Sequence, residues 1–418
     1  MLEEMGKAAR SAAREISRAS TETKNSFLND LADLLWVERS FILANNEVDI
    51  EKAQENGLSP AMVDRLTLNA DRLSGIANDL RSVASLDDPV GTLFDAKEMP
   101  NGLKVAKQRV PLGVLGVIYE SRPNVTIDIA GLGVKSGNAV ILRGGSETIH
   151  SNQALVRMIH MALEKNSLPV GVVQFIDSPD RAFVYEMLLM ADDIDMIIPR
   201  GGQGLHKFCR ENSRIPVMTG GIGICHLFID QTADLQKSLG VVRNAKIQRP
   251  TVCNALDTVL VHRSVAEEFL PVMVSTLAED GVRFKAHENA SPYLQDFNGE
   301  IVQPAGADDF DQEWLSLVLG IKVVETLDEA IEHIQAHSTG HSDGLLTEDP
   351  ANAEKFLAFI DSAVVYVNAS TRFTDGSELG LGAEVAVSTQ RLHARGPMAL
   401  QELTTYKWLV RGDYTVRA

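Results

Sequence analysis

Three shortages in the sequence narrow what this protein can be. Its 418 residues include only three cysteines, Cys209, Cys225 and Cys253, and none belongs to a C-x-x-C pair. This argues against a disulfide framework and against a cysteine-rich zinc site. No uncharged apolar stretch approaches the roughly 18 residues that a membrane span needs. The first ten residues include Glu3 and Glu4 and lack the apolar core of a secretion signal, so we expect a cytoplasmic protein with no membrane partner.

Positive charge is scarce as well. Lysine and arginine number 39 against 57 aspartates and glutamates, which gives a formal net charge of −18. A nucleic-acid surface needs a surplus of positive charge, so nucleic acid is not an expected partner. An anionic ligand must instead be met by local cationic residues. The 44% of hydrophobic residues is enough for a large core, and the length suggests two or three domains.

The rhythm of apolar residues predicts helices first and parallel sheets later. Residues 1–85 carry apolar residues at helical spacing and predict three or four helices, with Ser59-Pro60 as an N-cap followed by proline at the first helical position. Two partly alternating runs flank the turn signal Pro100-Asn101-Gly102 and predict a hairpin over about residues 92–110. Short apolar runs separated by helix-length segments then form two series. The first, before Asp230, is GVLGVIY, NAVILR, GVVQFI, DMIIP and ICHLFI. The second, after Asp230, is TVLVH, GIKVV, GLLT and AVVYVN. This alternation predicts an α/β fold with two parallel sheets and a boundary near Asp230.

Glycine-rich turns are the first candidates for ligand binding. After a parallel strand, such a turn can direct backbone N–H groups and a helix N-terminus at a pyrophosphate. Three turns qualify: RGGSE from Arg143, PRGGQG from Pro199 and TGGIG from Thr219. None matches G-x-G-x-x-G followed by an acidic residue about 20 positions later. Taken singly, each is better explained as a tight turn, although two of them have an adjacent arginine.

Cys253 is the candidate nucleophile among the cysteines. It follows Lys246, Arg249 and Pro250 at the junction of a helical segment and a strand. Positive neighbours favour the thiolate, which is the reactive form of cysteine. The local pattern alone still favours a buried, inert thiol, because unpaired cysteine is among the most buried residue types. Cys209 and Cys225 lack comparable neighbours, so we expect both to be structural.

Three histidines at a spacing of four, His333, His337 and His341, could gather metal ligands on one helix face. However, Gly340 predicts that the helix ends before His341, and no HExxH motif accompanies them. We therefore expect these side chains to cap and anchor a loop, with no bound metal.

Several segments together resemble the γ-glutamyl phosphate reductase family of the aldehyde dehydrogenase superfamily. The most specific are VIYESRPNVTID, SGNAVILRGG, DMIIPRGGQGLHKFCREN, QRPTVCN, YVNASTRFTDG and GLGAEVAVSTQRLHARGPM, and residues 324–345 also fit. The resemblance spans essentially the whole chain. It implies an aldehyde dehydrogenase-like α/β fold with an NADPH-binding domain (1–90 and 111–229), a catalytic domain with Cys253 (230–385) and oligomerisation elements (91–110 and 386–418).

The same resemblance implies an NADPH-dependent reduction of L-glutamyl 5-phosphate to L-glutamate 5-semialdehyde, the second step of proline biosynthesis from glutamate. It implies that Cys253 displaces phosphate to form a thioester, with Asn124 and the Cys253 backbone N–H as oxyanion donors. Met218 stands where hydrolytic aldehyde dehydrogenases carry a general-base glutamate, which suits a reductase. The superfamily's G-Q-x-C is replaced by Pro250-Thr251-Val252-Cys253. Either Lys246 or Arg249 is then expected to keep the thiol ionised.

Further binding residues follow from the resemblance. Arg143 stands where the superfamily has a lysine near the adenosine ribose, and a cation there can accept the 2′-phosphate of NADPH. The other expected cofactor-binding residues are Gly144, Gly201, Gly202, Glu378 and Glu384. The expected substrate-binding residues are Arg122, Arg249 and Arg372, as candidates for the α-carboxylate, with Ser370 as a neutral donor.

The resemblance also implies a homo-oligomer, formed through the hairpin and the C-terminal strand, and an association with glutamate 5-kinase. Two other functions remain open at this stage. One is a thiol acyltransferase or amidase that uses Cys253 without a nicotinamide. The other is a non-catalytic partner that keeps the fold and binds glutamate kinase.

Overall fold

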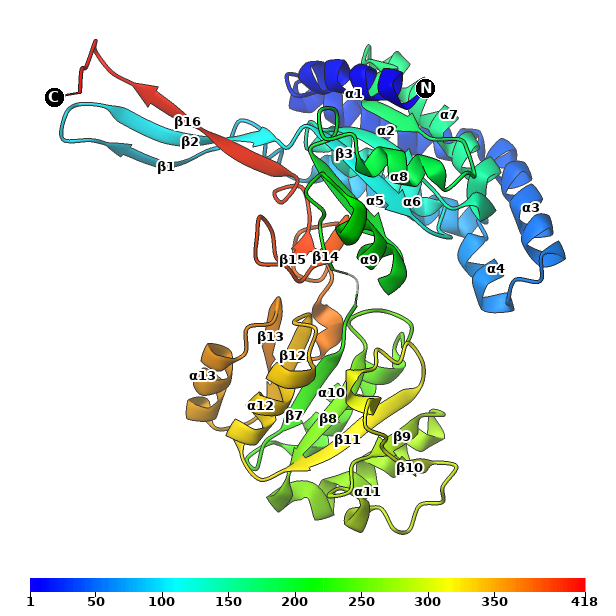
Figure 1. Ribbon diagram of the computed structural model, residues 1–418, viewed down its shortest axis with the longest axis vertical. Helices are drawn as coiled ribbons and strands as arrows, with labels where there is room; N and C mark the ends of the chain where they lie inside the picture. Colours follow the sequence, from blue (N-terminus) through cyan, green and yellow to red (C-terminus); the bar gives the residue numbers. More distant parts are fainter. Residues whose placement is uncertain (221, 418) are drawn as a thin grey trace. The chain divides into compact units, whose positions relative to one another are not determined.

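The computed structural model describes residues 1–220 and 222–417 of the chain, which divides into two compact units (Figure 1). Unit 1 comprises residues 1–219, 380–386 and 398–418. Unit 2 comprises residues 220–379 and 387–397. No helix in the described part of the chain is long and apolar enough to cross a membrane.

Unit 1 is built on a four-stranded parallel sheet. Its strands follow the order β5 (Val173–Phe175), β4 (Ala139–Arg143), β3 (Val114–Tyr119) and β6 (Met196–Arg200). Every residue of β3 and β4 is buried, which explains why these strands read as continuous apolar runs in the sequence. The helices that follow the strands are α6 (Asn124–Lys135), α7 (Ile149–Lys165), α8 (Ala182–Leu188) and α9 (Gln203–Asn212).

The N-terminal region of unit 1 forms five helices, where the sequence predicted three or four. They are α1 (Leu2–Ile16), α2 (Thr21–Val37), α3 (Arg39–Glu55), α4 (Pro60–Leu66) and α5 (Ala70–Ser85). Side chains of Ser20, Ser59 and Asn69 accept N–H groups at the starts of α2, α4 and α5. The short α4 begins at the predicted Ser59-Pro60 start signal.

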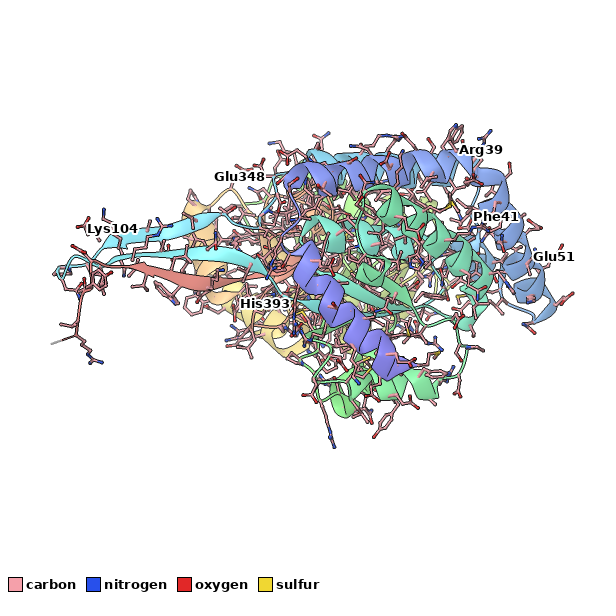
Figure 2. All side chains as sticks on the ribbon, turned by 90° about the horizontal axis from the view of Figure 1, so that it is seen from above. Arg39, Phe41, Glu51, Lys104, Glu348 and His393 are labelled. Atoms are coloured by element: carbon pink, nitrogen blue, oxygen red, sulfur yellow. The ribbon has the colours of Figure 1, made fainter. Side chains whose placement is uncertain are left out.

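A three-stranded antiparallel arm projects from unit 1 (Figures 1 and 2). Its order is β1 (Leu93–Glu98), β2 (Lys104–Pro111) and β16 (Thr404–Arg411). The predicted hairpin is present, and Gly102 adopts a φ of 82° in its turn. Figure 2 shows Lys104 on the arm, at the other end of the unit from Arg39 and Phe41.

Unit 2 contains a seven-stranded sheet in which all pairs are parallel. The order is β10 (Val302–Pro304), β9 (Arg283–Ala286), β11 (Val318–Val324), β8 (Leu256–His262), β7 (Cys225–Ile229), β12 (Ser342–Leu346) and β13 (Val364–Val367). Its helices are α10 (Leu235–Ile247), α11 (Arg263–Glu279), α12 (Leu327–His337) and α13 (Pro350–Phe359). Two further short strands, β14 (Ala386–Ser388) and β15 (Gly396–Met398), pair with each other.

The boundary between the sheets differs from the sequence prediction. The sequence assigned ICHLFI to the first series and set the boundary near Asp230, but β7 pairs with β8 and β12 in unit 2. The units separate between Thr219 and Gly220. A short strand buried on both faces has the same apolar pattern in either sheet, so only its pairing partners reveal where it belongs.

Candidate active site

Cys253 lies in the loop between α10 and β8, at the edge of the unit 2 sheet where the parallel strands begin. The helix ends at Ile247, three residues before Pro250, a residue that cannot continue a helix. The loop closes with a turn in which the Ala255 N–H donates to the Val252 carbonyl at 3.0 Å. Cys253 is half-buried and so keeps part of its surface accessible.

The other two cysteines are fully buried. Burial raises the pKa of Cys209 to about 11, and burial followed by nearby acidic groups raises the pKa of Cys225 well above its usual value. Both thiols therefore remain protonated near neutral pH. Cys253 is the one cysteine of the chain with accessible surface, which favours it as the reactive thiol.

The main chain of Cys253 packs directly against the start of β7. A Cβ atom added to Gly223 would lie 1.5 Å from the carbonyl oxygen of Cys253, so only glycine fits there. The Cys225 Sγ–H donates to the same carbonyl oxygen at 3.2 Å. The Gly223 N–H in turn donates to Glu313 Oε1 at 3.0 Å. These contacts hold the loop from the sheet side.

A second set of contacts joins the loop to the short 3₁₀ helix η5 (Thr371–Phe373). Asn254 Nδ2 donates to the carbonyls of Arg372 at 3.3 Å and Thr374 at 2.9 Å. Thr371 Oγ1 donates to the Asn254 carbonyl at 2.7 Å. The buried Ser370, a predicted substrate donor, caps η5, and its Oγ accepts the Arg372 N–H at 3.3 Å. The structure thus brings Ser370 and Arg372 next to the cysteine loop.

Arg249 and Arg372 form a cationic pair beside Cys253. Burial lowers the pKa of Arg372, and repulsion from Arg249 lowers it further, whereas Cys253 acts in the opposite direction. Arg372 Nε donates to Gln248 Oε1 at 3.0 Å, which fixes the half-buried guanidinium. The Arg372 guanidinium near the Cys253 thiol favours its ionised form, and together with Arg249 it forms a site for an anion.

The sequence offered Lys246 as one of two cations that could keep the Cys253 thiol ionised, but the structure gives its charge another partner. Its side chain is fully buried, and Nζ donates to the Leu256 carbonyl at 2.8 Å and lies 3.9 Å from Asp257 Oδ1. Burial lowers its pKa to about 8 and raises that of Asp257 to about 6. The charge of Lys246 is therefore directed at a buried carboxylate, whereas Arg372 interacts electrostatically with Cys253.

Two acidic residues next to the loop, Glu313 and Asp257, were not singled out from the sequence. Burial raises the pKa of Glu313 to about 7, and Asp257 contributes to this shift. The carboxylate of Asp257 also accepts the backbone N–H groups of Trp314 at 3.0 Å and of Cys225 at 3.4 Å. Asp257 follows Cys253 closely in the sequence, whereas Glu313 comes from a distant segment, so no local spacing could have pointed to Glu313.

Of the three spaced histidines, His333 and His341 are buried in unit 2, whereas His337 is partly exposed. The ring centroids of His333 and His337 lie 4.4 Å apart, and those of His226 and His333 lie 5.5 Å apart. Burial lowers the pKa of His333 to about 2 and that of His341 to about 4, so both are neutral near pH 7. His341 Nδ1 lies 2.8 Å from Ser342 Oγ. Within the described residues, no group of histidine, cysteine and acidic side chains could hold a metal ion.

The remaining predicted residues lie mostly in unit 1. Asn124 begins α6, and its Nδ2 donates to Asp128 Oδ2, one helical turn later, at 2.9 Å. Burial first, and then nearby Asp79, raise the pKa of Asp128 to about 7. Arg122 is half-buried just before α6. The i, i+4 spacing of Asn124 and Asp128 is visible in the sequence and could have revealed this pair.

Arg143 and Gly144 shape the loop after β4. Arg143 is 7% exposed, and its terminal nitrogens donate to the carbonyls of Gly144 at 2.6 Å and Pro179 at 3.1 Å. A Cβ atom on Gly144 would lie 2.3 Å from Asn152 Nδ2, so close packing requires this glycine. Glu147 Oε1 accepts the Ser121 N–H at 3.0 Å, which ties the loop to the end of β3.

The loop with Gly201 and Gly202 leads into α9. A Cβ atom on Gly201 would lie 2.4 Å from Glu120 Oε2, which also accepts the Gly202 N–H at 3.2 Å. Nothing lies within 4 Å of a Cβ atom built on Gly202 or Gly204, so the backbone there is open to a ligand. His206 Nδ1 is buried nearby without a hydrogen-bond partner. An open backbone at a helix N-terminus fits an anionic pyrophosphate.

The predicted acidic cofactor residues separate. Glu378 is exposed in unit 2, whereas Glu384 is half-buried in unit 1. Met218, at the position of the hydrolytic base, is buried, and its N–H donates to the Ile197 carbonyl at 2.8 Å. Met218 supplies no carboxylate for activating water.

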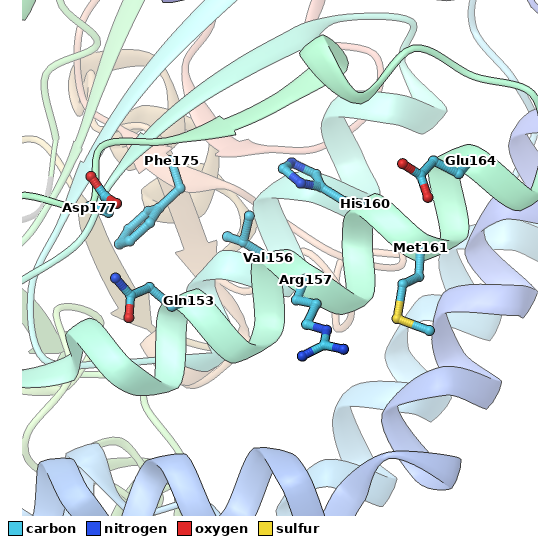
Figure 3. A pocket seen from close by; sticks show the side chains of 8 residues that line it. All are labelled: Gln153, Val156, Arg157, His160, Met161, Glu164, Phe175 and Asp177. Atoms are coloured by element: carbon cyan, nitrogen blue, oxygen red, sulfur yellow. The ribbon is translucent and has the colours of Figure 1, made fainter. Parts of the chain in front are cut away.

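A separate groove of about 410 Å³ lies between α7 and β5 (Figure 3). Gln153, Arg157 and Glu164 of α7 line it together with Phe175 and Asp177. None of its described lining residues is a predicted site residue.

Comparisons with known proteins place these features in context. Residues 2–289 match the aldehyde dehydrogenase family. The chain is 56% identical over 418 residues to γ-glutamyl phosphate reductase of Serratia proteamaculans (strain 568), with 100% of both sequences covered. The crystal structure of γ-glutamyl phosphate reductase from Thermotoga maritima matches with a TM-score of 0.97 and 47% identity, with 100% of both chains covered. An acetylating aldehyde dehydrogenase from Geobacillus thermoglucosidasius shares the fold, with a TM-score of 0.72 and 18% identity over 100% of this chain and 97% of that one.

Proposed function

Since the chain belongs to the γ-glutamyl phosphate reductases of the aldehyde dehydrogenase family, we propose that Cys253 is the nucleophile of its reaction. Family membership confirms the predicted fold class and the predicted step of proline biosynthesis, the reduction of L-glutamyl 5-phosphate to L-glutamate 5-semialdehyde. One observation carries the choice of nucleophile. Cys253 is the one cysteine with accessible surface, and Arg372 and Arg249 lie beside it.

The proposed first step is attack of the Cys253 thiolate on the acyl carbon of the substrate. The new C–S bond forms as the C–O bond to phosphate breaks, and phosphate leaves with the bonding electron pair. A thioester on Cys253 results. We propose the Cys253 backbone N–H as a donor to the oxyanion of this step, and the resemblance to the family implies Asn124 as the second donor. The Asn124 amide is oriented by its 2.9 Å hydrogen bond to Asp128. Loss of one such donor typically costs about 10²–10³ in rate.

The cationic pair Arg249 and Arg372 binds an anionic group of the substrate. The phosphate is bonded to the carbon that the thiol attacks, so it must lie close to Cys253 when the reaction begins. Ser370 adds a neutral donor next to this pair, and Arg122 remains a candidate for the α-carboxylate. Guanidinium groups suit both anions because they donate two parallel hydrogen bonds to carboxylate or phosphate oxygens.

The aldehyde dehydrogenase family uses a nicotinamide cofactor, and we propose NADPH for this chain. NADPH supplies the hydride that reduces the thioester when it is bound. The open backbone at Gly202 and Gly204, directly after Gly201, suits the pyrophosphate. Arg143 provides positive charge for a 2′-phosphate, and the exposed Arg181, which lies close enough to lower the pKa of Arg143 by repulsion, adds to that charge. The predicted contacts of Gly144, Glu378 and Glu384 belong to the same proposal.

A buried methionine at position 218 supports reduction over hydrolysis. A carboxylate there could activate water and release glutamate from the thioester before hydride arrived. Met218 cannot take up a proton, so the thioester is preserved for reduction.

We also propose a homo-oligomer that forms by strand addition. β16 is an edge strand of the arm, and its Tyr406, Trp408 and Val410 are 48%, 54% and 57% exposed. β13 is an edge strand of the unit 2 sheet. Edges with unpaired backbone groups and exposed aromatic side chains suit pairing with a second copy of the chain.

The experiment that tests the nucleophile is the reverse reaction, the phosphate-dependent oxidation of glutamate semialdehyde by NADP⁺. Replacing Cys253 with alanine should abolish turnover, whereas Cys209→Ala, a matched change at a buried thiol, should retain it. Retained turnover in the Cys253 variant would overturn the assignment. Measuring the rate with NAD⁺ in the same assay tests the preference for the 2′-phosphorylated cofactor.

A further inference from the structure

Cys225 lies directly behind the proposed nucleophile. It is the first residue of β7 and pairs with Leu256, three residues after Cys253. Its side chain is fully buried, and its Sγ lies 3.2 Å from the carbonyl oxygen of Cys253. The buried Cys225 thiol therefore contacts the main chain of the partly exposed Cys253.

This contact requires that Cys225 stays protonated. A thiol donates a hydrogen bond to a carbonyl oxygen, whereas a thiolate would repel it. Cys225 is buried, and Asp257, Asp343 and Glu313 surround it with acidic groups, which together raise its pKa well above the usual range. The same conditions make Cys225 a poor nucleophile and a lasting hydrogen-bond donor.

The carbonyl of Cys253 is also contacted from the sheet side by Gly223. Gly223 packs against it without a side chain and so provides contact but no hydrogen bond from a side chain. On the far side, Asn254 is held to the 3₁₀ helix through Thr371 and Thr374. Between the Gly223 contact and the Asn254 hydrogen bonds, the Cys225 thiol holds the peptide group that follows the Cys253 side chain.

We propose that Cys225 is a positioning residue for the reaction: its thiol holds the Cys253 carbonyl and thereby fixes the direction from which Cys253 Sγ attacks the acyl phosphate. This inference rests on the proposed role of Cys253. Geometric precision of this kind matters because a displacement of about 1 Å at a reacting group can cost about 10²-fold in rate.

The test compares Cys225→Ala, which removes the donor, with Cys225→Ser, which keeps one in a side chain of similar size. Cys209→Ala serves as the control for loss of a buried thiol elsewhere. The rate is expressed per chain in which Cys253 reacts with iodoacetamide while the remaining buried cysteines stay unlabelled, counted by mass spectrometry of the full chain, so that misfolded protein, in which the buried cysteines also react, does not contribute. We expect kcat to fall about tenfold in Cys225→Ala with KM within about twofold, because only alignment is lost. Cys225→Ser should recover most of the rate, and Cys209→Ala should match the parent.

Several results would overturn the proposal. One is a Cys225→Ala variant that melts at a lower temperature yet turns over normally per labelled thiol, since Cys225 would then be structural only. Another is a serine variant as slow as the alanine variant. If the alanine variant does not fold, Cys225→Val, which fills the space without a donor, replaces it under the same criteria. Activity in Cys253→Ala would contradict the proposed nucleophile itself, whatever the Cys225 variants show.

Discussion

Replacing Gly223 with alanine is expected to displace the loop that carries Cys253. The new Cβ atom would lie 1.5 Å from the carbonyl oxygen of Cys253 and 2.6 Å from its carbonyl carbon. Both are main-chain atoms, so no side-chain rotation can relieve the clash. The backbone of either Gly223 or Cys253 must move.

The size of the displacement follows from the contact distances. Cβ atoms essentially never lie closer than 3.0 Å to another heavy atom, so the carbonyl must separate from residue 223 by at least a further 1.5 Å. A misplacement of 1 Å can cost about 10²-fold in rate, so kcat should fall by at least about 10². Overpacking of this kind should also lower the free energy of unfolding by about 1–3 kcal/mol.

The reverse assay with phosphate, glutamate semialdehyde and NADP⁺ measures this loss, and iodoacetamide labelling counts the Cys253 thiols that remain accessible. Gly240→Ala is the matched control. Gly240 lies in the middle of α10 with nothing within 4 Å of an added Cβ atom, so alanine should preserve activity and stabilise the helix by about 0.5–1 kcal/mol.

A Gly223→Ala variant that keeps its rate within about threefold of the parent would refute this reasoning. Such a result would mean that the backbone at residue 223 yields without moving the nucleophile. Equal losses in Gly223→Ala and Gly240→Ala would contradict it as well, because only the first substitution contacts the loop.

Four further predictions concern charge and assembly. Burial raises the pKa of Glu313 to about 7 from its usual 4.5, so its contribution to stability is complete below about pH 4.5 and is lost as the pH rises through 7. Glu313→Gln keeps an acceptor for the Gly223 N–H but cannot ionise. This variant should reduce the change in unfolding free energy over that pH range by about 1–2 kcal/mol, a value lowered to allow for the partial exposure of Glu313. Asp343 is buried and accepts the backbone N–H and the imidazole of His226 as well as two serine hydroxyls, so Asp343→Ala should cost about 3–5 kcal/mol in urea unfolding. Arg372→Gln should raise KM for the acyl phosphate about tenfold or more and move iodoacetamide labelling of the nucleophile to higher pH, because the thiolate loses a cation. Trp408→Glu introduces a charge at a 54%-exposed position of the edge strand β16. Because the arm forms the proposed interface, light scattering should then find smaller species than for the parent.

Local patterns in the sequence predicted much of the secondary structure. The hairpin was found because Gly102 takes the positive φ that its turn requires, and the α4 start because Ser59 and Pro60 satisfy a helix N-terminus within three residues. Such features depend on neighbours along the chain. The short strands β9 and β10 were missed because three or four residues carry too little periodicity to be recognised.

The candidate site was only partly predictable. Cys253 and Arg249 lie close together in the sequence, and their association could be read from it. Arg372 reaches the same loop from beyond β13, and only its contacts through Asn254 reveal this. Lys246 shows the opposite case, since a residue near the cysteine in sequence directs its charge into the core at Asp257. Proximity along the chain does not determine on which side of a helix a charge is buried.

The sequence by itself determined the family, the helices and the apolar strands, because these depend on residue type and on spacing along the chain. The candidate nucleophile followed from the family resemblance, since the local pattern around Cys253 favoured an inert thiol. The tertiary structure decided which sheet contains β7, which cation acts on Cys253, and that Gly223 and Cys225 hold its carbonyl. These depend on contacts between segments far apart in the chain. Such contacts form only when the sheet brings the beginnings of its parallel strands to one edge.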